Sequence, residues 1–207
     1  SCVLLFPSGF QANLAAVCVL ADRHTTVLAD RLIHNSLLVG VRASGARLQR
    51  FQHNDLMDLE RRLQAMNGQP GSVVVLSESL FSMEGTSPDV AALAAVCQRF
   101  GADLLMDEAH ALGVLGAEGR GLCFGIEPVR LISGTFGKAF GSGGAFLACD
   151  ADLGDALLQT SGAFRYTTAL APPLVAGAQV ALDLIRSHPH WSQQLQQRAS
   201  HWRDALV

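Results

Sequence analysis

Polar side chains capable of acid–base or nucleophilic chemistry follow three short apolar runs of the sequence, residues 73–76, 104–106 and 131–133. They comprise acids, hydroxyls, one histidine and one lysine: Glu78, Ser82, Asp107, Glu108, His110, Thr135 and Lys138. Each of them alone is also typical of a strand end or a helix cap. In open α/β sheets, however, ligands bind beyond the carboxyl ends of the strands, so one acid, one histidine, two hydroxyls and one lysine of this set are predicted to share one crevice.

Lys138 offers the most specific chemistry of this set. It stands between Gly137 and Ala139, after an apolar run and before the glycine-rich turn at residues 140–144. Burial at this position would lower the pKa of the lysine amine, and a neutral amine is what condensation with a carbonyl to a Schiff base requires. The sequence therefore predicts a lysine that links covalently to a carbonyl group.

Asp107 directly follows an apolar run, where its charge can be buried only beside a cation. A protonated pyridine nitrogen is such a cation, and keeping it protonated makes the ring an electron sink. Thr135 and a helix that opens at residues 8–10 can hold a phosphate dianion, because the free N–H groups of a helix N-terminus attract anions. Together with Lys138, these groups predict a site for pyridoxal phosphate (PLP).

Two nucleotide-binding motifs compete with this interpretation, and both are incomplete. Residues 107–110 (DEAH) spell the acidic box of a helicase-type NTPase, a class that also needs the phosphate loop G-x-x-x-x-G-K-[ST]. Ala139 stands where that loop requires Ser or Thr, and Ile132 where it requires its first glycine. The run at residues 141–144 does not complete G-x-G-x-x-G, since Phe146 holds the last position. An NTP-binding domain and a dinucleotide fold are therefore disfavoured.

Short apolar strands alternate with helical patterns over most of the chain. Strands are predicted at residues 2–6, 26–30, 47–51, 73–76, 102–106, 131–133 and 145–149. Helices are predicted at residues 9–21, 34–43, 55–66, 88–100, 151–160 and 172–186. Strands that are apolar on both sides and alternate with helices favour a mainly parallel sheet with helices on both faces. The predicted fold class is therefore α/β.

The composition excludes several other classes of protein. With 207 residues, 49% hydrophobic and 16% charged, the chain has too much apolar material for disorder. A net charge of −3 without a basic run argues against a dedicated nucleic-acid binder. The longest apolar run, at residues 14–21, is too short for a membrane helix. The five cysteines form no C-x-x-C pair, which favours reduced thiols, a cytoplasmic location and no metal site.

Both ends of the sequence favour a chain that is part of a longer protein. The apolar strand predicted at residues 2–6 is preceded only by Ser1. At the other end, an amphipathic helix begins near Pro189 and runs to residue 207 without a Gly or Asn stop. We therefore expect truncation at both ends.

Seven ordered motifs resemble the α-oxoamine synthases, a family of fold-type I PLP-dependent enzymes. The motifs are FPSGFQAN at residues 6–13, DRLIHNS at 30–36, HNDL at 53–56, the segment from Glu78 through FSMEG at 81–85, MDEAH at 106–110, GAEGRG at 116–121 and TFGKAFG at 135–141. The resemblance covers nearly the whole chain. It implies the large domain of that fold, with residues 1–186 as a PLP-binding domain incomplete at its N-terminus. Residues 187–207 would then start the helix that leads to a small C-terminal domain.

The resemblance also implies roles for individual residues. Lys138 would carry PLP as a covalent aldimine, Asp107 would pair with the pyridine nitrogen, and His110 would contact the phenolic oxygen and assist proton transfer. The other cofactor-binding residues implied are Gly9, Phe10, His34, Ser82 and Thr135. His34, which would stack on the ring, and Glu78 would contact the substrate. Thr167 and Thr168 match a segment that reaches the phosphate in a partner subunit.

The implied activity is acyl transfer in biotin biosynthesis, by decarboxylative condensation of L-alanine with a pimeloyl thioester, either of coenzyme A or of a carrier protein. The implied assembly is a cytoplasmic homodimer with its active site at the subunit interface. The glycine C-acetyltransferase and 5-aminolevulinate synthase types share most of these motifs and remain alternatives. An inactive remnant of the PLP fold is a further alternative, since the expected truncation removes substrate-binding parts of the family.

Overall fold

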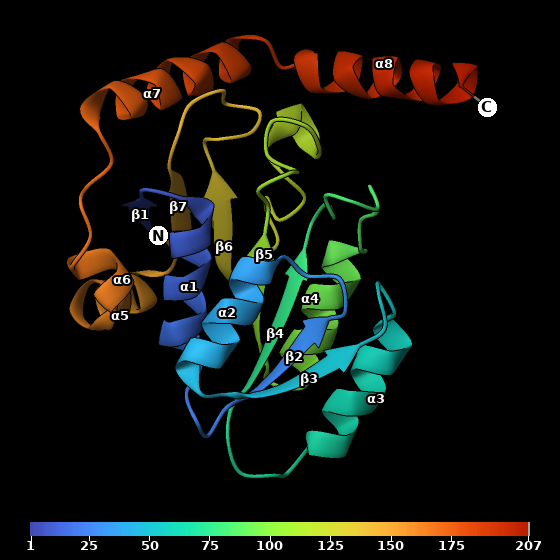
Figure 1. Ribbon diagram of the computed structural model, residues 1–207. Helices are drawn as coiled ribbons and strands as arrows, with labels where there is room; N and C mark the ends of the chain where they lie inside the picture. Colours follow the sequence, from blue (N-terminus) through green and yellow to red (C-terminus); the bar gives the residue numbers. More distant parts are fainter. Residues whose placement is uncertain (207) are drawn as a thin grey trace.

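Seven strands form one sheet in the computed structural model, which describes residues 1–206 (Figure 1). The strands are β1 (Cys2–Phe6), β2 (Thr26–Asp30), β3 (Arg47–Phe51), β4 (Val73–Glu78), β5 (Asp103–Asp107), β6 (Val129–Thr135) and β7 (Ala145–Cys149). Their order in the sheet is β1-β7-β6-β5-β4-β2-β3. The neighbours from β6 to β3 are parallel, whereas β7 is antiparallel to β1 and to β6. The predicted α/β class with a mainly parallel sheet is confirmed.

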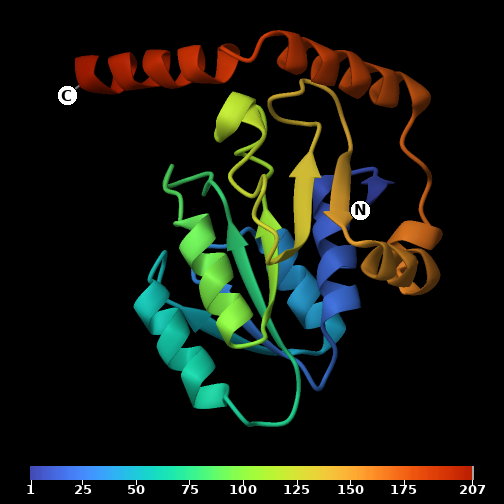
Figure 2. The ribbon, with the colours of Figure 1, turned by 180° about the vertical axis from the view of Figure 1, so that it is seen from behind.

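The helices connect the strands across both faces of the sheet. They are α1 (Gly9–Leu20), α2 (Asn35–Ser44), α3 (Leu56–Met66), α4 (Val90–Arg99), the 3-10 turn η1 (Ala117–Gly119), α5 (Ala151–Thr160), α6 (Gly162–Arg165), α7 (Pro172–Ser187) and α8 (Trp191–Ala205). Helices α1 and α2 lie on one face, and α3 and α4 lie on the other (Figures 1 and 2).

Alternating strand residues supply the two apolar layers, as expected from the two-residue period of a strand. In β5, Leu105 packs on the layer beneath α1 and α2, while Leu104 and Met106 pack on the layer beneath α3 and α4. All three side chains are fully buried. This is why the central strands are apolar at consecutive positions, and it confirms the prediction of a sheet with helices on both faces for β2, β4 and β5.

Side-chain caps determine where α1 and α2 begin. Ser8 Oγ accepts a hydrogen bond of 3.2 Å from the Gln11 N–H at the start of α1. His34 Nδ1 accepts one of 3.3 Å from the Ser36 N–H at the start of α2. Because these helices follow β1 and β2 directly, their N-termini lie at the carboxyl ends of the strands. The caps therefore position Gly9 and His34 beside the predicted crevice.

The edge of the sheet at β1 differs from the prediction. The sequence predicts an apolar strand at residues 2–6 in a sheet with helices on both faces, but Val3 and Leu5 are exposed while Leu4 and Phe6 are buried. The reason is that the β1, β7 and β6 part of the sheet is covered by helices on one face only within residues 1–206, as the view from behind shows (Figure 2).

Helices α7 and α8 run across the strand ends of the sheet (Figure 1). The predicted domain boundary after residue 186 falls one residue before the end of α7, and α8 begins only at Trp191, two residues after Pro189. Trp191, Leu195 and Trp202 of α8 are exposed. Within residues 1–206, no helix combines the length and the apolar composition needed to span a lipid bilayer.

Candidate active site

A cavity of about 210 Å³ lies where β4, β5 and β6 end, beside the first turns of α1 and α2. Its lining includes every predicted catalytic, cofactor or substrate residue except Ser82: Gly9, Phe10, His34, Glu78, Asp107, His110, Thr135 and Lys138. Asn13, Ser36 and Ala109 complete the lining. The strand order therefore brings together residues that are far apart in the sequence, as the shared-crevice argument predicts.

Asp107 is the buried anion at the floor of this cavity. Its side chain is 5% exposed, and Oδ1 accepts a hydrogen bond of 2.9 Å from the Ala109 N–H. Oδ2 accepts one of 2.7 Å from Asn13 Nδ2. Among the ion pairs of residues 1–206, none involves Asp107. The carboxylate is therefore buried and hydrogen-bonded but lacks the cation that would neutralise it.

Asn13 links Asp107 to the start of α2. Its side-chain amide, 2% exposed, also donates to Ser36 Oγ at 2.9 Å, and Ser36 Oγ lies 2.7 Å from His34 Nδ1. The Asn13 Oδ1 atom is buried and has no hydrogen-bond partner within residues 1–206. One buried amide thus orients Asp107 and, through Ser36, the imidazole of His34.

Glu78 is the second buried acid of the cavity, at 4% exposure. Burial, together with the negative charge of Asp107, raises the pKa of Glu78 to about 8. The His34 N–H, which donates to Glu78 Oε1 at 2.5 Å, opposes this shift. Glu78 is therefore protonated near neutral pH, and it holds the backbone of His34 beside the cavity.

His110 lines the same cavity from the segment after β5. Burial lowers the pKa of His110, and the charge of Lys138 lowers it further, while Asp107 acts in the opposite sense. The imidazole is therefore neutral at pH 7, so one nitrogen can donate a hydrogen bond and the other can accept a proton.

Thr135 shapes the turn that carries Lys138. Its hydroxyl donates to the Gly144 carbonyl at 3.0 Å and accepts from the Gly137 N–H at 3.1 Å. Lys138 projects from this turn and is exposed, so the predicted burial of the lysine is wrong. The physical reason is that the turn extends three residues past the end of β6 at Thr135, beyond the apolar layers of the sheet.

The first turn of α1 faces the cavity on the side of Thr135. A Cβ atom on Gly9 would lie 3.9 Å from Thr135 Oγ1. The N–H groups of Gly9 and Phe10 have no acceptor within their own helix, as in the first turn of any α-helix. The arrangement is therefore that of an anion site at a helix N-terminus.

The structure does not bring Ser82 into the cavity. Ser82 is exposed in the loop after β4, whereas Ser79, three residues earlier, is buried and donates to Glu108 Oε1 at 2.7 Å. Thr167 and Thr168 lie between α6 and α7 and do not line the cavity. Their role at the phosphate of a partner subunit remains a prediction.

Two features of the site are absent from the sequence-based predictions. Asn13 was not assigned a role, because its contact with Asp107 joins positions 94 residues apart. The available signal was a polar residue within a mainly apolar helix, whose other amide side chain is that of Gln11. Lys138 is also the only lysine of the 207 residues, against 14 arginines. A chain with a single lysine side chain has a single side-chain amine able to condense with an aldehyde.

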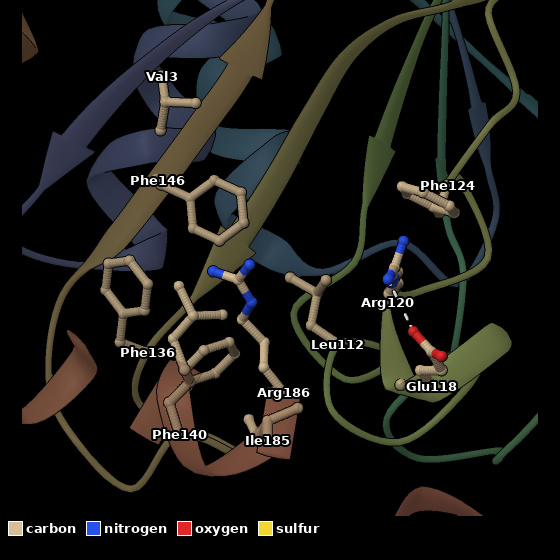
Figure 3. Close-up of a pocket in the computed structure, with 12 residues that line it drawn as sticks. Val3, Leu112, Glu118, Arg120, Phe124, Phe136, Phe140, Phe146, Ile185 and Arg186 are labelled. Atoms are coloured by element: carbon tan, nitrogen blue, oxygen red, sulfur yellow. Dashed lines mark hydrogen bonds and ion pairs between the residues drawn. The ribbon is translucent and has the colours of Figure 1, made fainter. Parts of the chain in front are cut away.

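A second and larger cavity, of about 440 Å³, lies on the side of β1 and β7 opposite to α1, and residues of α7 line part of it (Figure 3). Phe124, Phe136, Phe140 and Phe146 line it together with Arg186. Its only acid, Glu118, pairs with Arg120 at 2.7 Å. This composition suits apolar contact rather than proton transfer, so we place the candidate active site at the smaller cavity.

No cluster of three or more His, Cys, Asp or Glu side chains within residues 1–206 is arranged to hold a metal ion. The smaller cavity instead combines an exposed amine, a buried unpaired carboxylate, a neutral imidazole, a protonated acid and a helix N-terminus. This set can bind a phosphorylated, positively charged ring and move protons beside it.

Comparison with known proteins gives consistent matches over the whole chain. A model of the aminotransferase class I and II family matches residues 2–207. The 8-amino-7-oxononanoate synthase of Chromohalobacter salexigens is 44% identical over 204 residues, which cover 97% of this chain and 52% of that protein. A putative 8-amino-7-oxononanoate synthase of Bordetella pertussis is 46% identical over 189 residues, covering 88% and 47%. The chain spans about half the length of the curated relatives it matches.

Solved structures with the same arrangement include two kinds of enzyme. A serine palmitoyltransferase of Sphingomonas wittichii superposes with a TM-score of 0.84 at 30% identity, covering 97% of this chain and 49% of that one. The 8-amino-7-oxononanoate synthase of Francisella tularensis gives 0.79 at 31% identity, covering 94% and 57%. A serine palmitoyltransferase structure with a PLP internal aldimine gives 0.83 at 29% identity, covering 99% and 50%.

Proposed function

The chain belongs to the aminotransferase class I and II family of PLP-dependent enzymes, and from this premise we propose that it is the cofactor-binding part of an α-oxoamine synthase of the 8-amino-7-oxononanoate synthase type. The observation that carries the proposal is the buried, cation-free carboxylate of Asp107 in the cavity that also contains Lys138. The 44% identity to 8-amino-7-oxononanoate synthases supports the more specific assignment.

The residues of the cavity fit PLP. Asp107 needs a cationic hydrogen-bond donor, and a pyridinium N–H is one. Beside Thr135, the Gly9 and Phe10 N–H groups can receive the phosphate dianion. The Thr135 hydroxyl already donates its proton to the Gly144 carbonyl. Thr135 therefore supports the phosphate site by holding the turn and its Gly137 N–H in place, rather than by donating its own proton.

When bound, PLP supplies an electron sink that stabilises negative charge at the α-carbon of an amino acid. Asp107 keeps the pyridine nitrogen protonated, and Asn13 keeps Asp107 in position. Lys138 Nζ would hold the cofactor, and the same amine, when free, would take the proton from the α-carbon of the amino acid. His110, neutral at pH 7, can give a proton to an oxygen of the acyl substrate or of the cofactor ring.

His34 and Glu78 are proposed to contact the substrate. His34 lines the cavity and is exposed, and its flat imidazole would stack on the cofactor ring. Glu78, protonated near neutral pH, can donate a hydrogen bond to a substrate carboxylate without repelling it. Ser82 does not line this cavity. Its proposed contact with the cofactor would require the loop after β4 to move.

The proposed reaction is the decarboxylative condensation of L-alanine with a pimeloyl thioester. A bond forms between the α-carbon of alanine and the acyl carbon, the thiol leaves, and carbon dioxide is lost. The products are 8-amino-7-oxononanoate, carbon dioxide and the free thiol. Residues 1–186 are proposed as the PLP-binding domain, and the assembly as a homodimer in which Thr167 and Thr168 reach the partner's phosphate site.

Cofactor binding can be tested on the chain itself, because Lys138 is its only lysine. The protein is incubated with PLP, reduced with borohydride and digested with trypsin. A pyridoxyl group is expected on Lys138, within the peptide of residues 131–165. In Lys138→Ala, only the α-amino group of Ser1 remains as a primary amine and reports background labelling. Equal pyridoxyl labelling of Ser1 and Lys138 in the parent would contradict the proposal of a specific PLP site.

Substrate choice is tested by offering alanine, glycine and serine with pimeloyl-coenzyme A. A chimera in which this chain replaces the matching half of the Chromohalobacter relative supplies the remaining segments. Release of free thiol is expected with alanine at a rate at least tenfold above glycine or serine. Preference for glycine would point to the glycine C-acetyltransferase or 5-aminolevulinate synthase type. PLP labelling without release of thiol from any amino acid would indicate an inactive PLP fold.

A further inference from the structure

Cys2 and Cys149 face each other across two antiparallel strands. They are register partners in the β1–β7 pair, and both side chains pack against the apolar layer beneath α1. Both are half-buried, and both carry free thiols. The pair lies at the edge of the sheet, outside the candidate active site.

Both sulfur atoms lie beside Gly154 of α5. A Cβ atom built on Gly154 would lie 2.5 Å from Cys2 Sγ and 3.9 Å from Cys149 Sγ. The absence of a side chain at Gly154 therefore leaves a shared space for both sulfurs. The pKa of Cys149 is raised by burial and by the neighbouring Cys2, which is a consequence of the same proximity.

The backbone already meets the main requirement for a disulfide. Residues directly opposite each other on antiparallel strands have Cα atoms about 4.5 to 5.5 Å apart. Disulfides form at Cα separations of about 4.4 to 6.8 Å. The bond can therefore form by rotation of the two side chains, without unfolding of β1.

We propose that Cys2 and Cys149 form a reversible cross-strand disulfide in the folded chain when it meets a small-molecule disulfide such as glutathione disulfide. The Cys2 thiolate attacks one sulfur of the oxidant, whose S–S bond breaks and releases one glutathione. The Cys149 thiolate then displaces the second glutathione and closes the protein disulfide. Two protein thiols are oxidised, the oxidant is reduced to two thiols, and the two protein protons pass to the leaving groups.

The other three cysteines are placed where they cannot compete in the folded chain. Cys97 and Cys123 are buried in the layer on the opposite face of the sheet. Cys18 is exposed on α1, and its sulfur points to the Gly40 carbonyl at 3.8 Å. Of the ten pairs that five cysteines allow, Cys2–Cys149 is therefore the one whose two sulfurs are both partly accessible and lie beside the same glycine.

The experiment incubates the folded chain with glutathione disulfide, quenches with acid, alkylates the remaining thiols and maps the tryptic peptides. The Cys18→Ser variant is used, because Cys2 and Cys18 share the peptide of residues 1–23. The expected product joins residues 1–23 to residues 139–165, and dithiothreitol separates them. Cys2→Ser and Cys149→Ser are the matched variants in which this species must be absent.

A parallel reaction in urea tests whether the fold selects the pair. In the unfolded parent chain, Cys2 is expected to pair preferentially with Cys18, because that loop is much shorter. The proposal is overturned if the folded chain gives only separate glutathione adducts on Cys2 and Cys149. It is also overturned if the folded parent links Cys2 to Cys18, or if the Cys2–Cys149 product forms equally well in urea.

Discussion

Glu78 and Asp107 are register partners at the last positions of the neighbouring parallel strands β4 and β5. Both carboxyl groups are buried and line the same cavity. Two buried acids so close together cannot both be charged without a large cost, and Asp107 is the one with two hydrogen-bond donors to its carboxylate oxygens. Glu78 is accordingly the acid whose pKa is raised.

The first prediction concerns the pH dependence of stability. Glu78 keeps its proton up to about pH 8 in the folded chain, whereas the unfolded chain loses it near the ordinary value of 4.5. The folded state therefore binds more protons between these values, and the free energy of unfolding falls as the pH rises through that window. Glu78→Gln should be more stable than the parent by a few kcal/mol, to order of magnitude, above about pH 8.

The measurement is urea unfolding of both proteins, followed by far-UV circular dichroism from about pH 5 to about pH 9. The advantage of Glu78→Gln should shrink toward the acid end of this range. Glu127→Gln, which changes an exposed carboxylate, is the control and should show no such trend. An advantage of the same size at every pH would contradict the raised pKa of Glu78.

The second prediction concerns Asn13 as the residue that positions Asp107. Asn13→Ala removes the 2.7 Å hydrogen bond to Asp107 Oδ2 and should weaken PLP binding about tenfold, which corresponds to about 1.4 kcal/mol. Gln11→Ala is the matched control on the same helix, since its amide donates to the Ala163 carbonyl instead. Titration with PLP, read by absorbance, compares the variants. If Asn13→Ala and Gln11→Ala bind PLP with equal affinity, Asn13 does not contribute to PLP binding.

The third prediction concerns the loop that Glu108 holds. Glu108 Oε1 accepts hydrogen bonds from the Leu122 and Cys123 N–H groups, at 2.7 and 3.0 Å. A Cβ on Gly121 would lie 2.2 Å from Glu108 Oε2, and Gly121 has φ of +86°. Gly121→Ala should therefore lower the free energy of unfolding by about 3 kcal/mol or more.

Gly125→Ala separates the cost of the positive φ from the cost of the contact with Glu108. Gly125 has a similar φ of +80° but no atom within 4 Å of its added Cβ, so only the backbone cost of about 1 to 2 kcal/mol should appear. Urea unfolding of both variants gives the comparison. If the two substitutions cost the same, the contact with Glu108 contributes nothing beyond backbone strain.

The fourth prediction concerns the hydroxyl of Thr135. Thr135→Val keeps the shape but loses the hydrogen bonds to the Gly144 carbonyl and from the Gly137 N–H. We expect a loss of about 1 to 3 kcal/mol in the free energy of unfolding and weaker labelling of Lys138 by PLP. Thr135→Ser retains the hydroxyl, so it should keep most of the stability and most of the labelling of Lys138. Failure of Thr135→Ser to recover either property would show that the methyl group, not the hydroxyl, matters.

Much of the fold was predictable because its signals are local. The predicted strands at residues 26–30, 47–51 and 145–149 coincide with β2, β3 and β7. The predicted strands of β4 and β6 were too short, since Glu78 and Thr135 are their last residues rather than residues that follow them. A polar side chain ends an apolar run in the sequence, but it does not end a strand whose backbone remains hydrogen-bonded to its neighbour.

The candidate site was predictable to the extent that it follows the strand ends. Asp107, His110, Thr135 and Lys138 were expected around one crevice, and all four line the cavity. Position in the sequence alone could not show which of the two serines, Ser79 or Ser82, is buried. Burial distinguishes them, and burial depends on the path that the loop after β4 takes over the sheet.

Local sequence fixes which polar groups stand at or just after the ends of which strands, because the apolar period of two and the helix caps are encoded within a few residues. Tertiary structure alone decided that β1 pairs with β7, that Asn13 reaches Asp107, and that Lys138 stands exposed. Lys138 is exposed because its turn extends past the end of β6, whereas the other two are contacts set by the order of strands in the sheet. That order emerges from burial of all the apolar faces at once, which no single stretch of the sequence records.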